Sequence, residues 1–302
     1  MTDTFKYSEI FHSFQGEGAL TGRSTAWIRF FLCNLQCDGF GQKDPTDPDT
    51  YILPYEDFDV STVKNIEDLP VWKYGCDSSY TWAKKYKHLA HDIPAHEIVN
   101  KIQGVLRHPS NPDGLFVHPK TGQDHHMAFT GGEPMLKQNQ KAIVAILNEF
   151  AERGNVPKNF TVETNGTQVI KEDSEAYETI KKFANPKHFS WFWSISPKLW
   201  STAGEKTEKA IKPEVVASYY NISPRGQLKY VVNGTQESWE EVEANTAAFR
   251  EAGAGFPVYI MAVGATKEEQ EDKQIADIAM EAMKRGYHFS GRLHAHVFGN
   301  AI

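Results

Sequence analysis

The chain has 302 residues, of which 40% are hydrophobic and 24% are charged, and its formal net charge is −7. These proportions are typical of globular proteins and exclude wholesale disorder. The acidic balance excludes a protein that grips nucleic acid backbones directly, because that role needs clustered Lys and Arg. No apolar run approaches the roughly 20 residues that span a bilayer, so we expect no membrane contact and a cytoplasmic location.

Two strand-like runs come first along the chain, and helical and strand-like patterns alternate after residue 97. The second early run covers 26–32 and follows a Gly-rich loop. We expect helices at 98–106, 142–153, 174–183, 237–252 and 268–284, and further strands at 126–130, 160–163, 191–196, 227–232, 257–261 and 292–297. Strands that alternate with helices predict parallel pairing with right-handed crossovers. The predicted fold class is therefore α/β, a sheet or barrel, in a single domain over 1–302.

Two stretches interrupt this alternation. Residues 38–75 hold nine acidic residues against three lysines, four prolines and six aromatic residues. We expect an inserted loop or small subdomain there, whose aromatic side chains pack partly against the rest of the protein. Residues 107–124 are rich in Pro, Gly, Asn and His and predict a long surface excursion.

The only cysteines are Cys33, Cys37 and Cys76. An odd number favours metal ligation over a disulfide framework. Cys33 and Cys37 follow the strand at 26–32, and their spacing suits two thiolates that turn toward one metal centre, although two buried small apolar residues would fit it too. Cys76 could reach the same centre for about 2–3 kcal/mol of extra loop-closure entropy. Three thiolates would leave one iron of a cubane cluster open to another ligand.

Six short motifs accompany these cysteines: FQGEG at 14–18, WIRF at 27–30, FTGGEP at 129–134, VETNG at 162–166, SPKL at 196–199 and QLKYVV at 227–232. Together they resemble the 7-carboxy-7-deazaguanine synthase (QueE) family of radical S-adenosylmethionine (SAM) enzymes, and they span nearly the whole chain. The resemblance implies a partial TIM-type barrel with parallel strands and outer helices. CDSSYTW at 76–82 is similar to the end of the family's cysteine motif, so residues 38–75 stand as an insertion inside that motif.

The resemblance also implies a reaction and its cofactors. The family converts 6-carboxy-5,6,7,8-tetrahydropterin to 7-carboxy-7-deazaguanine with loss of ammonia, in the biosynthesis of deazapurines such as queuosine. It uses a 4Fe-4S cluster, SAM and Mg²⁺. A reduced cluster cleaves SAM to a 5′-deoxyadenosyl radical, which removes hydrogen from the pterin. A flavodoxin-type reductant and a homodimer are further implied partners.

Site residues are carried over from the family by motif. The cluster ligands would be Cys33, Cys37 and Cys76. The SAM contacts would be Gly75, Asp77, Gly131, Gly132, Glu133, Glu163, Ser196, Pro197 and Lys198. The substrate contacts would be Phe14, Gln15, Gly16, Glu17, Arg29, Thr130, His296 and the terminal carboxylate of Ile302. Ser78 stands where the family has a magnesium-binding threonine, and it keeps the hydroxyl oxygen that a hard cation prefers.

Several of these residues have a second interpretation. The run Gly131–Pro134 is also typical of a plain turn that ends a strand, and Glu163 could be a solvated strand end. Arg29 lies in an apolar strand and needs an anion, which could be the substrate carboxylate or an internal salt bridge. His294 and His296 alternate on the expected strand at 292–297 and could form a zinc pair, while the resemblance favours His296 alone.

Two rival hypotheses for the function remain at this stage. The chain could be another radical SAM enzyme or an activase, which would lack the substrate set Gln15, Glu17, Arg29 and His296. It could also be a noncatalytic scaffold whose cysteines hold structural zinc and whose acidic insertion recruits a partner.

Overall fold

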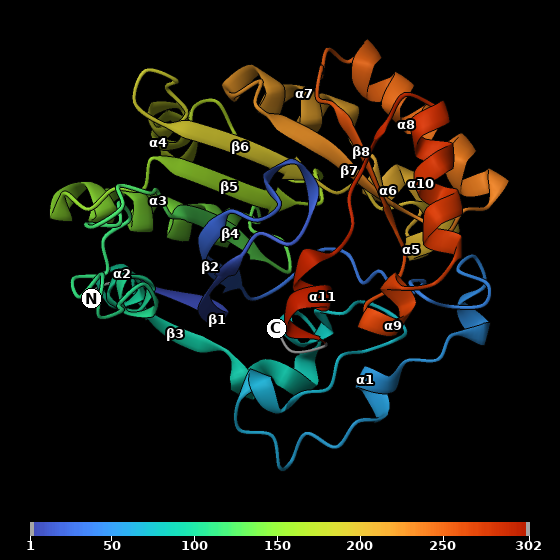
Figure 1. Cartoon of the computed structure of the whole chain (residues 1–302), viewed down its shortest axis with the longest axis horizontal. Helices are drawn as coiled ribbons and strands as arrows, with labels where there is room; N and C mark the ends of the chain where they lie inside the picture. Colours follow the sequence, from blue (N-terminus) through green and yellow to red (C-terminus); the bar gives the residue numbers. More distant parts are fainter. Residues whose placement is uncertain (1–2, 300–302) are drawn as a thin grey trace.

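The computed structural model describes residues 3–299. The strands of this part form one sheet in the order β3-β1-β2-β4-β5-β6-β7-β8-β9 (Figure 1). β1 pairs antiparallel with β2 and β3, and all pairs from β2–β4 to β8–β9 are parallel. The strands are β1 (Thr4–Phe14), β2 (Ser24–Phe30), β3 (His91–Pro94), β4 (His126–Gly131), β5 (Asn159–Thr164), β6 (Ser190–Ile195), β7 (Gly226–Val232), β8 (Val258–Ala262) and β9 (His288–Phe289).

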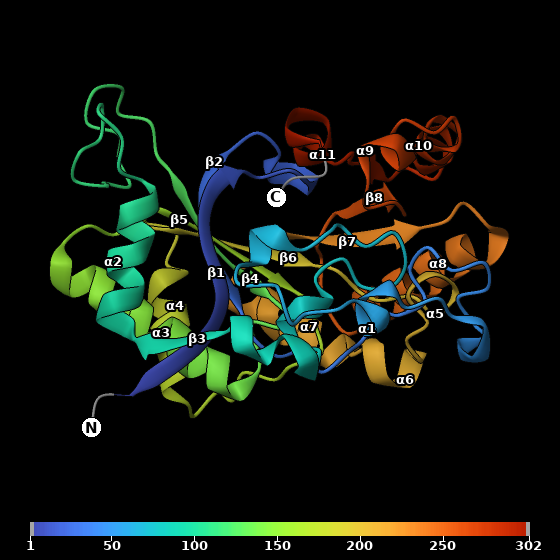
Figure 2. The same cartoon turned by 90° about the horizontal axis from the view of Figure 1, so that it is seen from below.

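The helices pack mainly on one face of this curved sheet (Figures 1 and 2). They are α1 (Pro54–Asp57), α2 (Ala95–Val105), α3 (Lys137–Arg153), α4 (Glu175–Phe183), α5 (Trp200–Ala203), α6 (Thr207–Ala210), α7 (Pro213–Ile222), α8 (Gln236–Glu251), α9 (Lys267–Gln270), α10 (Gln274–Lys284) and α11 (Leu293–Phe298). The main core joins alternate residues of the parallel strands to the inner faces of α2, α3, α4, α7 and α8. The α/β prediction, a partial barrel with outer helices, is confirmed.

Local sequence explains where several helices begin and end. The hydroxyls of Ser174 and Thr235 accept hydrogen bonds from the backbone N–H groups of Tyr177 and Ser238, which caps α4 and α8 at their first turns. Gly154 ends α3 with a φ of 69°, in the left-handed region where glycine carries no steric penalty.

Two of the expected elements are wrong. Leu293–Phe298 form the helix α11 rather than the expected strand at 292–297, and the last strand is β9. The alternation of two histidines is too short to tell a strand from a short helix. The stretch 268–284 is not one helix: a capping box between Thr266 and Glu269 begins the short helix α9, which ends at Gln270, and α10 begins at Gln274. The sequence also gave no signal for β3 or for α5 to α7.

The acidic insertion at 38–75 folds into turns and one short helix around an apolar cluster of its own. Tyr55, Val63 and Trp72 of the insertion pack there against Tyr86 and Leu89, which follow it in the chain. The excursion at 107–124 is also anchored, because the ring of Phe116 is buried and meets the ring of Phe150 edge to face at 5.3 Å. Both segments are therefore held to the fold by aromatic side chains.

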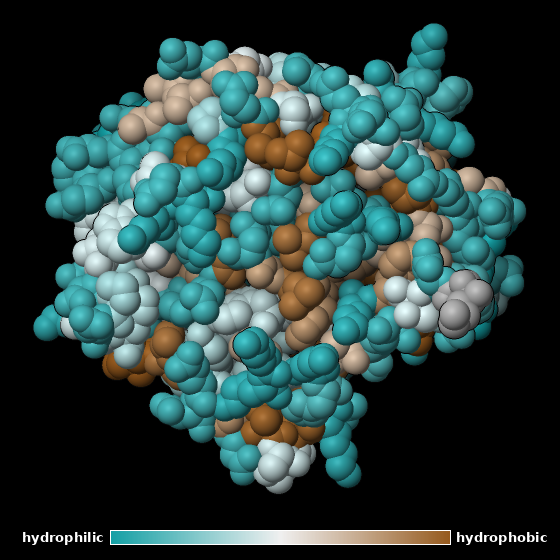
Figure 3. Space-filling model, turned by 180° about the vertical axis from the view of Figure 1, so that it is seen from behind, coloured by the Kyte–Doolittle hydropathy of each residue, from teal (hydrophilic) through white to brown (hydrophobic). Residues whose placement is uncertain are grey.

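Between residues 3 and 299, no helix combines the length and the apolar character needed to cross a membrane. The face opposite to the view of Figure 1 is largely hydrophilic, and its apolar side chains lie scattered in small groups (Figure 3).

Candidate active site

A row of polar side chains crosses the inner face of the sheet. Residues in register on neighbouring parallel strands line up side by side, and successive residues point to opposite faces. The neighbours of the row, such as Phe129 and Val162, therefore face the helices and are buried in the main core. We call this set the interior row, and its members are Arg29, Thr130, Glu163, Ser194 and Gln227.

The loop after β1 lies across the interior row. The amide Nε2 of Gln15 donates to Oε1 of Glu163 at 3.0 Å, and its Oε1 accepts from the backbone N–H of Glu17 at 3.0 Å. Thr130 Oγ1 donates to the other oxygen of Glu163 at 3.4 Å. Four residues predicted to bind SAM or substrate are thus brought together, and Glu163 is a member of a hydrogen-bonded group rather than a solvated strand end.

Glu17 stands between two cations. Lys229 Nζ donates to its Oε2, and Arg292 Nε lies 3.0 Å from its Oε1. Burial alone would raise the pKa of Glu17, but these two charges outweigh it and hold the pKa well below its usual 4.5. Sequence reasoning missed both cations, although an isolated Lys on an otherwise apolar strand could have pointed to Lys229.

Arg29 is paired within the protein. Its Nε lies 2.5 Å from Oε1 of Glu9 on β1, and Tyr80 donates its hydroxyl hydrogen to the same oxygen at 2.8 Å. The internal salt bridge foreseen as the alternative for Arg29 is therefore present. Its Nη1 donates to Oγ of Ser78 at 3.2 Å, and Ser78 Oγ donates to Oδ1 of Asp77 at 3.1 Å. Ser78 and Asp77 thus offer two adjacent oxygen atoms beside the interior row.

The C-terminal helix presents a different histidine from the predicted one. His296 is exposed, whereas the ring of His294 lies against Gly16, where an added Cβ would be 1.8 Å from Nδ1. On a helix, residues two positions apart point in different directions, so the pair cannot share a ligand as strand neighbours could. His294 is the better candidate for a substrate contact. Ile302 lies outside the described residues.

Phe14, the first residue of the FQGEG motif, is 48% exposed at the end of β1. It is therefore one of the exposed members of the predicted substrate contacts.

The three cysteines converge in one small cluster of side chains beyond the carboxyl end of β2. Cys33 and Cys76 pack there against Leu35, Cys37 and Ala203. Within residues 3–299 no three His, Cys, Asp or Glu side chains meet closely enough to hold a single metal ion. A cubane cluster has a different requirement, since each cysteine binds a separate iron and the sulfur atoms stand further apart.

Strain and a buried carboxylate shape the cysteine loop. Leu32 and Cys37, which flank the loop, are the non-glycine residues of the described chain with positive φ, at 81° and 58°. Oε1 of Glu205, which lies between α5 and α6, accepts from the backbone N–H groups of Gln36 at 2.6 Å and Cys37 at 2.9 Å. This clamp compensates for the strained backbone and fixes the direction in which the cysteines point.

The thiols of the three cysteines suit a group that brings positive charge. Burial is the main cause that raises the pKa of Cys33 to about 12 and that of Cys76 to about 11, and it raises the pKa of Cys37 as well. The metal-free chain keeps these thiols protonated, so iron must displace their protons when it binds. The donor set of three free thiols on a preshaped loop fits a 4Fe-4S cluster.

The glycine pair after β4 packs against this loop. A Cβ on Gly132 would stand 2.2 Å from the carbonyl oxygen of Leu32 and 3.0 Å from Cβ of Cys33, and the backbone N–H of Glu133 donates to Leu32 O at 2.9 Å. Gly131 has a φ of 140°. The run is therefore more than a turn, because only glycine allows β4 to approach the cysteine loop so closely.

Glu133 accepts three hydrogen bonds within the protein. Its fully buried carboxylate accepts from the backbone N–H groups of Met135 at 2.8 Å and Asn165 at 2.7 Å, and from Thr164 Oγ1 at 2.6 Å. Burial raises its pKa to about 7 despite these donors. The carboxylate thus joins the ends of β4 and β5, and the contact of Glu133 with SAM stays a prediction.

The remaining SAM candidates surround the cysteines. Lys198 Nζ donates to Oγ of Ser196 at 3.0 Å and lies 5.5 Å from the centre of the Phe40 ring. Pro197 lies between these two residues, just beyond the carboxyl end of β6. Gly75 precedes Cys76 with a φ of 77°, and its N–H donates to Phe40 O at 2.8 Å.

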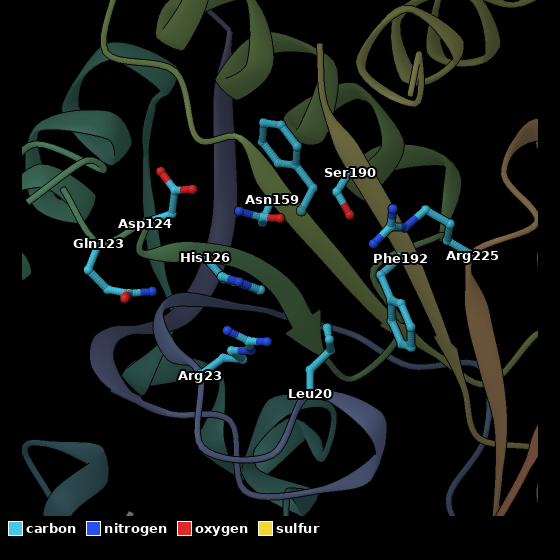
Figure 4. A pocket seen from close by; sticks show the side chains of 10 residues that line it. Leu20, Arg23, Gln123, Asp124, His126, Asn159, Ser190, Phe192 and Arg225 are labelled. Atoms are coloured by element: carbon cyan, nitrogen blue, oxygen red, sulfur yellow. The ribbon is translucent and has the colours of Figure 1, made fainter. Parts of the chain in front are cut away.

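A separate pocket of about 240 Å³ opens at the amino ends of the parallel strands. Figure 4 shows Arg23, His126 and Asn159 reaching into it. The site residues predicted from the sequence are not among those that line it. The candidate site thus occupies the inner face of the sheet and the carboxyl ends of its strands, the end where barrel folds of this kind place their chemistry.

No protein family model matches the chain. Among proteins of known function, the 7-carboxy-7-deazaguanine synthase of Halobacterium salinarum is 25% identical over 97% of this chain and 90% of its own length. That of Pyrobaculum aerophilum is 24% identical over 99% of this chain and 97% of its own length. The crystal structure of QueE from Escherichia coli is similar to this fold with a TM-score of 0.54 over 96% of this chain and 95% of that one, at 15% identity.

The solved structure shares the fold of this chain, and the three cysteines converge where the sequence predicts the cluster of a radical SAM enzyme. The chain is similar along nearly its whole length to 7-carboxy-7-deazaguanine synthases, and the resemblance found in its motifs is confirmed.

Proposed function

We propose that this protein is a 7-carboxy-7-deazaguanine synthase, which converts 6-carboxy-5,6,7,8-tetrahydropterin to 7-carboxy-7-deazaguanine with loss of ammonia. One observation carries the proposal: the segment that follows Cys76 is bonded to the interior row, through Ser78 to Arg29 at 3.2 Å. The cluster side and the substrate side of the site are thereby adjoining parts of one structure.

The cluster and SAM, when bound, supply the one-electron chemistry that starts the reaction. Cys33, Cys37 and Cys76 would hold the cluster, and Gly132, Ser196, Pro197 and Lys198 would bind SAM beside it. Ser78 and Asp77 offer a hydroxyl and a carboxylate oxygen, the donors that Mg²⁺ prefers.

The pterin would lie on the interior row beneath the loop 15–18. Gln15, Thr130 and Glu163 present amide, hydroxyl and carboxylate groups suited to its amino-pyrimidinone edge. Glu17 stays ionised beside Lys229 and Arg292 and can accept hydrogen bonds from the ring nitrogens. The side chains of the interior row and the loop 15–18 above them would keep water away from the reacting carbon.

A flavodoxin-type electron donor, a homodimer and a cytoplasmic location complete the proposal. They follow from the family resemblance and, for the location, from three cysteines that need a reducing compartment.

Anaerobic turnover with reductant, Mg²⁺, SAM and the carboxypterin tests the proposal, with the product identified by mass. We expect 7-carboxy-7-deazaguanine, and we expect none from the Cys76→Ala variant. Brown protein that forms 5′-deoxyadenosine but no deazaguanine would identify a different radical SAM enzyme or an activase. Colourless protein containing zinc would favour the scaffold hypothesis instead.

A further inference from the structure

The side chain of Arg292 connects three segments that are far apart in the sequence. Its Nε lies 3.0 Å from Glu17 Oε1, its Nη2 donates to Asp77 Oδ2 at 2.9 Å, and its Nη1 donates to Gly264 O at 3.0 Å. The side chain of Arg292 is only 14% exposed. One planar group thus reaches the loop after β1, the segment after Cys76 and the turn after β8.

The helix α11, which Arg292 precedes, lies beside the connection between β1 and β2 (Figure 2), and its start is bonded to the loop 15–18. Leu293 N–H donates to Gly16 O at 2.8 Å, and Gly18 N–H donates to Ser290 Oγ at 2.6 Å. The residues before and after Arg292 in the sequence are therefore both bonded to this loop. The direction of Arg292 is set by the fold and is not that of a free surface side chain.

The two carboxylates that Arg292 joins belong to different halves of the site. Glu17 has a second cation, Lys229, and its side chain is 13% exposed. Asp77 is 42% exposed at the rim, next to Cys76, and Arg292 is its ion-pair partner. Loss of Arg292 would leave Glu17 in place but would release the cluster segment from the loop that covers the substrate.

We propose that Arg292 is a positioning residue, which fixes the substrate loop at Glu17 relative to the cluster segment at Asp77 and so sets the separation between substrate and SAM. This inference rests on the proposed function and deepens it. Hydrogen transfer to a radical requires the two reacting atoms to be held close together, and a displacement of about 1 Å can cost on the order of 10²-fold in rate. A loosened site would still cleave SAM but would often fail to react with the pterin.

The test compares wild type, Arg292→Gln and Arg292→Lys as anaerobically purified holoenzymes. Lysine keeps the charge but cannot make three separate contacts in one plane. Arg285→Gln is the matched control, since Arg285 is a partly buried arginine that pairs with Glu243 and Glu281 on the outer helices. Iron content and Tm establish that each variant is folded and loaded.

Two measurements decide the matter. The first is the ratio of 5′-deoxyadenosine to deazaguanine product, which should rise in both Arg292 variants, with product formation slower on the order of 10²-fold in Arg292→Gln. The second is amide hydrogen exchange in the metal-free chains, which should accelerate at 76–82 and 288–299 in the Arg292 variants alone.

Wild-type ratios and unchanged exchange in both Arg292 variants would overturn the positioning role. If Arg292→Gln does not fold, Arg292→Lys decides by the same two measurements. Wild-type protein that yields no deazaguanine would instead refute the proposed function, while the exchange comparison would still report whether Arg292 joins the two segments.

Discussion

Replacing Glu205 by alanine should prevent the cysteine loop from holding iron. The carboxylate makes two charge-assisted hydrogen bonds to the backbone of Gln36 and Cys37, at 2.6 and 2.9 Å, and it is 5% exposed. Its pair with Lys209 at 3.0 Å adds little, because the lysine side chain is 49% exposed. The alanine variant leaves both N–H groups without their acceptor next to a residue of positive φ.

The expected loss follows from these contacts. A hydrogen bond to a charged group contributes about 1.5–3 kcal/mol, and the loss of the buried carboxylate removes a desolvation cost that offsets part of two such bonds. We therefore expect the free energy of unfolding of the metal-free chain to fall by about 3 kcal/mol. Glu205→Gln keeps an acceptor oxygen for both N–H groups and should lose only about 1 kcal/mol.

Urea unfolding measures the free energy of unfolding. The iron and sulfide content per chain after anaerobic reconstitution measures how well the cysteine loop holds the cluster. Glu208→Ala is the matched control, because Glu208 is an exposed residue of α6, three positions further along. The reasoning is refuted if Glu205→Ala unfolds at the wild-type urea concentration and takes up iron as completely as the control.

Three further predictions address the cluster, the charged pair and the insertion. Cys76→Ala should abolish cluster assembly, and intact iron and sulfide loading in that variant would contradict the assignment of Cys76 as a ligand. Because the folded-state pKa of Glu17 lies well below 4.5, its stabilising effect is present above that pH and is lost as the pH falls below it. Glu17→Gln should thus flatten the decline of the unfolding free energy on acidification, and parallel curves for variant and wild type would refute this. Trp72→Ala should cost about 3–5 kcal/mol, since the indole is buried in the apolar cluster of the insertion, and an unchanged urea midpoint would show that this cluster does not contribute to the stability of the chain.

Much of the fold followed from patterns within short stretches of sequence. In the strands NFTVET and SWFWSI, alternate residues point toward the helices and toward the site. This two-residue alternation can be recognised in the sequence without knowing which strands pair with each other. The same local patterns failed near the C-terminus, where His294 and His296 alternate but lie on a helix. A few residues of alternation fit a strand or a short helix equally well, and only packing decides between them.

The sequence by itself identified the three cysteines as ligands, the motifs around them and the class of chemistry they support. It could do so because ligand type and glycine positions depend only on residue identity. Only the tertiary structure decided which partners share the site: Lys229 and Arg292 with Glu17, Glu9 with Arg29, and Glu205 with the cysteine loop. These pairs join positions up to 275 residues apart, which is the separation of Glu17 from Arg292 (292 − 17). No local pattern encodes such a contact, since it exists only once the strands and crossovers have brought both residues to one face of the sheet.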